Sequence, residues 1–409
     1  HYLKVCGKQF SKLLSSQQVQ AEADRVWCGV KRCLFGNGKE LHFKKLMDFD
    51  TIGGKSNKNG ARFDLDAMYV NWLGLSLKCY LPKSENSLSY VWESLKGKIS
   101  YCNIKRLMFS SGWRYYAEII VSGDAPTRVS IGTSTMGIDP GVSTIAGVSE
   151  DACVLEELAP NAIQYEKRIQ TISQSMDRSR RISNPNKYNE DGTINRSNRD
   201  PWKYSKNYVK MCRLLKSLYR KKHAYIIDSH RELCNKLITI AKYFPVEKMH
   251  FQALQKRAKE TKRQEKKTEV KQKDGTVKVI QKYKRKKRFG RSINRRAPAR
   301  FLLELKRKAE AVGGVYAEVD TKEFKASQYN HVTDTYEKIP LSQREKEIGK
   351  RKVQRDLYSA FLIRNADLDF KHPDREKCEY EFEYFADMQE QLILKMKESG
   401  LSMRQCFGF

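Results

Sequence analysis

The chain of 409 residues is longer than one ordinary domain, so two or three domains are expected. Its 79 Lys and Arg residues outnumber its 48 Asp and Glu residues and leave a formal charge of +31, which makes nucleic acid the expected partner. Hydrophobic residues make up 40% and aromatic residues 11%, which excludes a disordered basic tail, and no apolar run is long enough for a membrane-spanning helix.

Ten cysteines are scattered along the chain, and no two of them form a Cys-x-x-Cys pair. Structural zinc sites usually take their thiolates from such close pairs, so we expect neither a zinc site nor a disulfide framework. Scattered thiols in a long basic chain that shows no secretion leader at His1 are typical of reduced cysteines in a cytoplasm.

Residues 1–128 combine a helix with β-strands. Polar and apolar residues recur at helical spacing from Ser11 to Leu34. A β-hairpin is predicted where Ser110-Ser111-Gly112 joins Ile104–Phe109 to Trp113–Val121. We therefore expect a small antiparallel barrel or sheet with a helical part attached.

Residues 129–365 alternate between strands and helices, which predicts an α/β sheet. Met136–Asp139 forms its first strand and turns at Pro140-Gly141 into Val142–Val148, which runs back beside it. Pro245 ends the second of two long helices, which make a helical hairpin over 162–243. The other elements expected are helices at 162–182, 202–243, 301–312 and 355–364 and strands at 246–251 and 315–319; a helical extension follows at 366–409.

The most basic stretch of the chain is 256–300, which holds 20 Lys and Arg residues and four acidic ones. Lys273-Asp274-Gly275-Thr276 predicts a hairpin turn inside it. One interpretation is a solvated basic loop, and the other is a lid that grips backbone phosphates over a neighbouring cleft.

Three positions suggest an acidic site, namely Asp139 at the end of the first strand, Gln252 after the strand at 246–251, and Asp356 at the start of the helix at 355. Two-metal phosphodiester cleavage needs acidic oxygens that converge from separate elements, and elements of an α/β sheet can supply them at one edge. Each position also has a plain structural interpretation, because Asp-Pro-Gly is a common turn and a carboxylate is favoured in the first turn of a helix. Gln252 is not an acid.

At this point the chain resembles a known family. Gly137-Ile138-Asp139-Pro140-Gly141, Phe251-Gln252-Ala253-Leu254 and Arg355-Asp356-Leu357-Tyr358-Ser359-Ala360 resemble the three split RuvC motifs of TnpB, the transposon-encoded RNA-guided DNA endonuclease, and of the compact type V CRISPR effectors related to it. Further similar segments are the Ser-Arg-Arg-x-x-Asn-Pro loop at 179–185, Asn294-Arg295-Arg296-Ala297-Pro298 and Ala326-Ser327-Gln328.

The resemblance implies an RNase H-like RuvC nuclease domain, preceded by a wedge β-barrel with a helical recognition part. It implies that Asp139, position 252 and Asp356 hold two Mg²⁺ ions, and that the partners are a guide RNA and double-stranded target DNA with a short adjacent motif. It also implies a bacterial or phage-encoded protein. Many members carry a four-cysteine zinc element, which this chain lacks because no Cys occurs from 235 to 377. The oligomeric state stays open.

Gln252 departs from the glutamate of the second motif. Glu247 lies five residues earlier, about 16 Å back along an extended strand at ~3.3 Å per residue, so we do not expect it to substitute. The preferred hypothesis is an engineered replacement of a native Glu at 252, and a Gln252→Glu variant that stays inactive with Mg²⁺ would contradict it. The alternatives are an RNA-guided repressor that binds DNA without cutting it and an RNA-independent RuvC-like resolvase or transposase.

Further residues are predicted to contact nucleic acid because they lie in basic or motif-like segments. They are Arg178, Arg180, Arg181, Lys203, Arg291, Arg295, Arg296, Arg300, Gln328 and Arg355.

Overall fold

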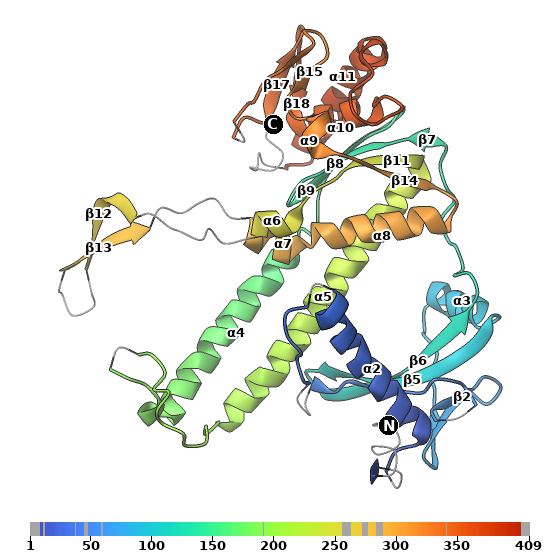
Figure 1. Cartoon of the computed structure of the whole chain (residues 1–409), viewed down its shortest axis with the longest axis vertical. Coiled ribbons are helices and arrows are strands. Elements are labelled where there is room, and N and C mark those ends of the chain that lie inside the picture. The colour runs from blue at the N-terminus through green and yellow to red at the C-terminus, as the bar shows by residue number, and fades with distance from the viewer. Residues whose placement is uncertain are drawn as a thin grey trace. The chain divides into compact units, whose positions relative to one another are not determined.

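The computed structural model describes residues 9–10, 13–36, 38–44, 48–58, 60–190, 192–255, 263–271, 277–283, 289–340 and 342–401 (Figure 1). The chain divides into two compact units. The first comprises His1–Pro126 and Ile169–Arg220, and the second comprises Thr127–Arg168 and Lys221–Phe409. This division differs from the segments predicted at 1–128, 129–365 and 366–409, because the far part of the helical hairpin groups with the N-terminal residues.

The first unit contains two three-stranded antiparallel sheets, ordered β1-β5-β6 and β2-β3-β4. The predicted hairpin is confirmed as its longest pair of strands, and the predicted helix begins at Ser16, where the Ser15 side chain caps it. The described strands form two sheets and not one continuous barrel. The elements are α2 Ser16–Phe35, β1 Thr51–Gly53, β2 Arg62–Asp64, β3 Tyr69–Trp72, β4 Leu75–Lys78, α3 Glu85–Ser94, β5 Lys98–Phe109 and β6 Gly112–Ser122.

The second unit is built on a mixed sheet with the order β10-β9-β8-β11-β14, and β7 also pairs with β11. β8, β9 and β10 are antiparallel neighbours, whereas β11 runs parallel to both β8 and β14. This sheet, with helices on both faces, is consistent with the predicted RNase H-like class. Its strands are β7 Ser134–Thr135, β8 Gly137–Pro140, β9 Thr144–Val148, β10 Cys153–Glu157, β11 Ala241–Glu247 and β14 Val315–Val319.

Two apolar cores cover the two faces of this sheet. Alternate residues of β9 supply both, since Ile145 belongs to the core that contains α5 and α8, and Ala146 belongs to the core that contains α10 and α11. In Figure 1, α8 and α10 accordingly lie on opposite sides of the strands. These helices are α4 Ala162–Ser183, α5 Lys206–Ile240, α8 Pro298–Ala311, α10 Arg355–Arg364 and α11 Arg375–Glu398.

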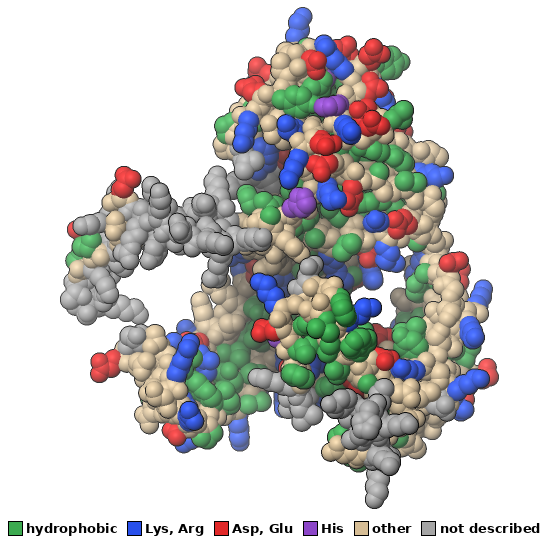
Figure 2. Space-filling model, in the orientation of Figure 1, with side chains coloured by type: hydrophobic (Ala, Val, Ile, Leu, Met, Phe, Trp, Pro, Cys, Tyr) green, Lys and Arg blue, Asp and Glu red, His purple; other side chains and the backbone are tan. Residues whose placement is uncertain are grey.

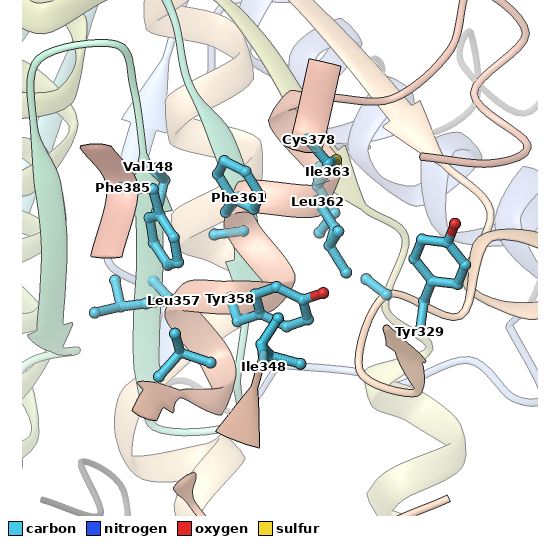
Figure 3. Packing of buried hydrophobic residues seen from close by; sticks show 14 of the residues in the cluster. Val148, Tyr329, Ile348, Leu357, Tyr358, Phe361, Leu362, Ile363, Cys378 and Phe385 are labelled. Carbon is cyan, nitrogen blue, oxygen red and sulfur yellow. The ribbon is translucent and has the colours of Figure 1, made fainter. Parts of the chain in front are cut away.

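The α10–α11 core is rich in stacked aromatic rings (Figure 3). The rings of Phe361 and Phe385 lie 4.5 Å apart between centroids at an interplanar angle of 18°, and both side chains are about 1% exposed or less. Tyr358 is also fully buried there, and its hydroxyl meets the ring of His331. The core fixes α10 firmly, which matters because α10 carries Asp356 in its first turn.

Smaller elements extend the second unit. The hairpin turn predicted at 273–276 lies outside the described residues, but the strands on either side of it pair in antiparallel fashion as predicted. Residues 256–262 and 284–288 of the predicted lid also lie outside them. The smaller elements of the chain are the 3-10 helix η2 Pro185–Lys187, α6 Phe251–Gln255, α7 Gly290–Arg296, α9 Thr321–Phe324, β12 Arg263–Lys271, β13 Val277–Tyr283, β15 Tyr329–Asn330, β16 Thr335–Tyr336, β17 Glu345–Ile348 and β18 Arg351–Gln354.

One prediction of secondary structure is wrong in a way that affects the site. The sequence predicted a helix up to Tyr243 and a strand over 246–251, but α5 ends at Ile240 and β11 spans Ala241–Glu247. Pro245 does not terminate a helix as predicted; it lies inside the strand, at the point where the neighbour of β11 changes from β7 to β8. The strand therefore ends at Glu247.

None of the helices in the described part of the chain combines the length and the apolar character that crossing a membrane requires.

Candidate active site

Two carboxylates lie side by side at the ends of neighbouring strands. β8 and β11 are parallel, with Ile138 in register with Val246, so the next residues, Asp139 and Glu247, lie opposite each other on the same face. Their carboxyl groups are hydrogen-bonded to each other. Such a bond requires a proton on one of the two acids, which agrees with the raised pKa of Asp139.

The surroundings of this pair raise both pKa values. Burial raises the pKa of Asp139 well above its usual 3.8, and the nearby charges of Glu247 and Asp356 raise it further, with the Arg355 guanidinium opposing them. Burial also raises the pKa of Glu247, and the hydrogen bond from Asp139 works against this. Two like charges held this close disfavour full ionisation, so a cation would be attracted in place of the shared proton.

Close packing of α10 on β8 brings Asp356 to this pair. A Cβ atom placed on Gly137 would lie 2.2 Å from the carbonyl oxygen of Ala360 and 2.3 Å from the backbone nitrogen of Arg364. Only glycine therefore allows this approach. The helix begins at Arg355, where the Gln354 side chain accepts a 2.7 Å hydrogen bond from the backbone N–H of Leu357.

Asp356 is held by two arginines. Its Oδ1 accepts hydrogen bonds from Nε and Nη2 of Arg355 at 3.2 and 3.0 Å, and its Oδ2 accepts one from Nη1 of Arg344 at 3.4 Å. The Asp356 side chain is 16% exposed and that of Arg355 only 9%. In this structure the Arg355 guanidinium donates to the carboxylate beside it, and its contact with nucleic acid stays a prediction.

Gln252 does not occupy the place that the sequence analysis gave it. It lies five residues after the end of β11, on the short helix α6, with an exposed side chain. The prediction that Glu247 is too far back along the strand is wrong, because the strand ends at Glu247. The second carboxylate beside Asp139 is therefore Glu247, and nothing in the site requires an acid at 252.

The paired carboxylates of Asp139 and Glu247 suit a hard divalent cation, whereas the position of Asp356 does not yet complete a metal site. Carboxylate oxygens are the ligands that Mg²⁺ prefers, and a pair that shares a proton can exchange it for a metal ion. Among the described residues, however, no three His, Cys, Asp or Glu side chains are already gathered around one metal position. The third carboxylate, Asp356, is instead turned to Arg344 and Arg355.

Two of the predicted nucleic-acid contacts are internal ion pairs. Arg295 lies 2.6 Å from Glu166, and Arg296 pairs with Glu157 where both side chains are about a tenth exposed. These guanidiniums stabilise the second unit through their ion pairs, and contact of Arg295 and Arg296 with nucleic acid stays a prediction. Arg291 and Arg300, on the same stretch, are exposed.

The remaining predicted contacts have different surroundings. Arg180 and Arg181 both pair with Asp177 at 2.7 and 2.8 Å, and Arg178 and Lys203 are exposed. Gln328 lines a cavity in the second unit. On the face shown in Figure 2, the Lys and Arg side chains of the described residues are spread among acidic ones.

Sequence reasoning rejected one residue of this site, Glu247, and missed another, Arg344. A signal existed for Glu247, because Phe244-Pro245-Val246 is a buried apolar run that an acid terminates. No sequence signal marked Arg344, which precedes β17 and reaches Asp356 only through the fold.

Comparisons with known proteins give structural matches only. No family model matches the sequence, and no curated protein matches it. One similar solved structure is the cryo-EM structure of a Cas12f1–sgRNA–target DNA complex, with 12% identity over 89% of this chain and 74% of that chain and a TM-score of 0.45. Another is the cryo-EM structure of a CRISPR-Cas12f ternary complex, with 14% identity over 91% and 74% of the two chains and a TM-score of 0.30.

Proposed function

We propose that the chain is a divalent-metal-dependent DNA endonuclease of the RuvC type, directed to its target by a bound guide RNA. The observation that carries this proposal is the pairing of Asp139 with Glu247 at the ends of adjacent parallel strands, with Asp356 close enough to raise the pKa of Asp139. Three acids from separate elements at one edge of a sheet are the arrangement that two-metal phosphodiester hydrolysis needs.

In this proposal Asp139, Glu247 and Asp356 hold two Mg²⁺ ions. When bound, such ions polarise the scissile phosphate and lower the pKa of the attacking water. To act as ligands the acids would have to be ionised, with the proton of the Asp139–Glu247 pair released to water, and Asp356 is already held as an acceptor by Arg344 and Arg355. Arg344, whose side chain is 26% exposed, would supply positive charge and N–H donors toward the phosphate.

The proposed partners follow from the net positive charge of the chain and from its RuvC-like motifs. A formal charge of +31 needs a polyanion to neutralise it, and the RuvC-like motifs favour a guide RNA with double-stranded DNA that carries a short adjacent motif. The exposed Arg291 and Arg300 lie in the most basic stretch and are the residues of that stretch that we propose for phosphate contact. Gln252 is no longer proposed as a ligand or as the cause of inactivity.

A cleavage assay tests the proposal. The full chain is purified, the RNA that copurifies with it is sequenced, and DNA matching that RNA is supplied with Mg²⁺. We expect cleavage by the wild-type chain, loss of cleavage in Glu247→Gln, and unchanged cleavage in Gln252→Glu. Cleavage that appears only in Gln252→Glu would show that Glu247 is not the second ligand.

A second function, RNA-guided DNA binding without cleavage, has one observation in its favour. Both oxygens of Asp356 are engaged by arginines, which compete with a metal ion. A chain that binds its matching DNA tightly but leaves it intact with either Mg²⁺ or Mn²⁺ would support this alternative.

A further inference from the structure

A cavity of about 530 Å³ lies in the second unit, lined by residues of β15, β17 and β18 and of the loop between them. Its size falls in the range of pockets that bind one small organic group. Its lining residues in the described part of the chain all lie in the 25-residue stretch from Gln328 to Lys352, between β14 and α10 in the sequence. Nothing in the metal-binding proposal uses this cavity.

The uncharged lining combines amides with apolar side chains. Gln328, Asn330 and Gln343 bring carboxamide groups, and Ile339 and Pro340 bring apolar surface. A carboxamide offers a donor and an acceptor in one plane, which is what the edge of a nucleobase requires, and aliphatic side chains pack against its flat face. This lining suits a planar group with mixed donors and acceptors.

The charges of the lining argue against a pocket built for a bare anion. Three lysines are matched by three glutamates, so the lining carries no net charge. They are Lys338, Lys346, Lys352, Glu337, Glu345 and Glu347. A phosphate would meet as many carboxylates as ammonium groups there, whereas a neutral base would not be repelled.

Lys346 gives the cavity a buried donor. The residue is 8% exposed, its Nζ donates to the carbonyl oxygen of Tyr329 at 3.4 Å, and it lies 5.5 Å from the centre of the Tyr358 ring. The hydrogen bond uses one of three N–H donors, so others can serve a carbonyl oxygen or ring nitrogen of a base. Tyr329 and Tyr358 belong to the aromatic core of Figure 3, which holds this lysine in place.

The cavity wall is directly connected to the carboxylate cluster. The carbonyl oxygen of Gln343 accepts a 3.2 Å hydrogen bond from Nη1 of Arg355, and Nη2 of the same arginine donates to Asp356. One residue therefore links the cavity to the site where a strand would be cut.

We propose that this cavity takes up a single unstacked base of the DNA strand that passes the Asp139–Glu247–Asp356 site. The inference rests on the proposed nuclease function. Extruding one base next to the cutting site would fix the register of the strand, as enzymes that flip bases do with their own pockets.

Photo-cross-linking tests this inference. The full chain, with any copurifying RNA left in place, is irradiated with single-stranded DNA that carries 4-thiothymidine, and cross-linked peptides are identified by mass spectrometry. Binding of the same DNA is measured separately by fluorescence anisotropy. In the wild-type chain we expect cross-links within residues 328–352. In Ile339→Trp, whose larger side chain fills the cavity, we expect the cross-link yield, divided by the amount of DNA bound, to fall about tenfold.

Val332→Trp is the matched control, since Val332 is exposed on the neighbouring turn and does not line the cavity. It should leave the yield unchanged. Gln328→Leu, which removes one amide with little change of volume, should lower the yield as well and serves if Ile339→Trp does not fold. Bound DNA that cross-links only outside 328–352 would overturn the cavity assignment alone, whereas failure to bind DNA at all would overturn the proposed function with it.

Discussion

The backbone of β8 at Gly137 lies directly against the backbone of α10 at Ala360, so close that a Cβ on Gly137 would fall 2.2 Å from the Ala360 carbonyl oxygen. Because Asp139 is the third residue of β8 and Asp356 is the second residue of α10, this contact sets the distance between the two acids. The need for glycine at position 137 therefore comes from packing, and it affects how close Asp139 and Asp356 lie.

Replacing Gly137 by Ala should therefore destabilise the protein. The added methyl group meets backbone atoms that cannot rotate away, so we expect a loss of about 3 kcal/mol in the free energy of unfolding. Urea denaturation measures it. Gly290→Ala is the control, because a Cβ there would meet nothing closer than 4.0 Å, and it should change stability little. Equal effects of the two substitutions would contradict the packing argument.

The carboxylate pair should make stability depend on pH and on divalent cations. The pKa of Asp139 is raised in the folded state, so the unfolded chain loses its proton first, and stability falls as the pH rises from the usual value of 3.8 toward the raised one. Asp139→Asn removes this penalty. Without divalent cations we expect the variant to melt above the wild-type chain at pH 8 and to lose this advantage at about pH 4.

Magnesium should reverse that order. Mg²⁺ binds the folded wild-type chain through its carboxylates and raises its melting temperature, whereas Asp139→Asn gains little. Differential scanning fluorimetry with and without Mg²⁺ checks both statements. The quantity to follow is the difference in melting temperature between the wild-type chain and Asp139→Asn. If this difference changed with neither pH nor Mg²⁺, the result would contradict a shared-proton pair.

Buried histidines should weaken the fold in mild acid. Burial lowers the pKa of His331 to about 4, while its ring nitrogen Nδ1 bonds the Tyr358 hydroxyl at 2.8 Å. The unfolded chain takes up its proton near the usual 6.5, so stability falls between that pH and about 4. His331→Gln lacks this titration, and the difference from wild type should change by about 3 kcal/mol between pH 7.5 and 4, measured by urea denaturation. A constant difference would contradict the neutral buried ring.

Two arginines of the basic stretch should behave in opposite ways. Arg296 forms a buried pair with Glu157, so Arg296→Gln should cost about 3 kcal/mol of stability. Arg291 is exposed, so Arg291→Gln should leave stability unchanged and lower the slope of log affinity against log salt concentration by about 1 for nucleic acid. Urea denaturation and salt-dependent anisotropy separate the two. Equal salt slopes for Arg291→Gln and the wild-type chain would remove Arg291 from the interface.

The sequence predicted the β8–β9 pair, the helices α4, α8 and α10 and the strand β14. In each of them hydrophobic residues recur at the spacing of a helix or a strand, and a clear turn or cap marks an end. Pro245 misled the prediction at β11. Proline usually marks the end of a helix or an edge strand of a sheet. Here Pro245 lies inside β11, where the neighbouring strand changes from β7 to β8, and this change accommodates it. Shifting that strand by a few residues moved the expected acid from Glu247 to Gln252.

Other features of the site depend on tertiary contacts that a single sequence does not reveal. The closeness of Gly137 to Ala360 joins residues more than 200 positions apart, and the arginines on Asp356 include Arg344, which lies just before β17 and outside the main sheet. The basic charge predicted a nucleic-acid partner, but charge alone could not separate the exposed Arg291 from Arg296, whose partner Glu157 lies on β10.

Manganese binding measured by electron paramagnetic resonance tests the central claim most directly, because Mn²⁺ takes the same oxygen ligands as Mg²⁺ and its binding needs neither guide nor DNA. The account predicts that the wild-type chain and Gln252→Glu bind Mn²⁺ alike, and that Glu247→Gln weakens binding by about tenfold or more. Unaltered binding in Glu247→Gln together with tighter binding in Gln252→Glu would contradict it.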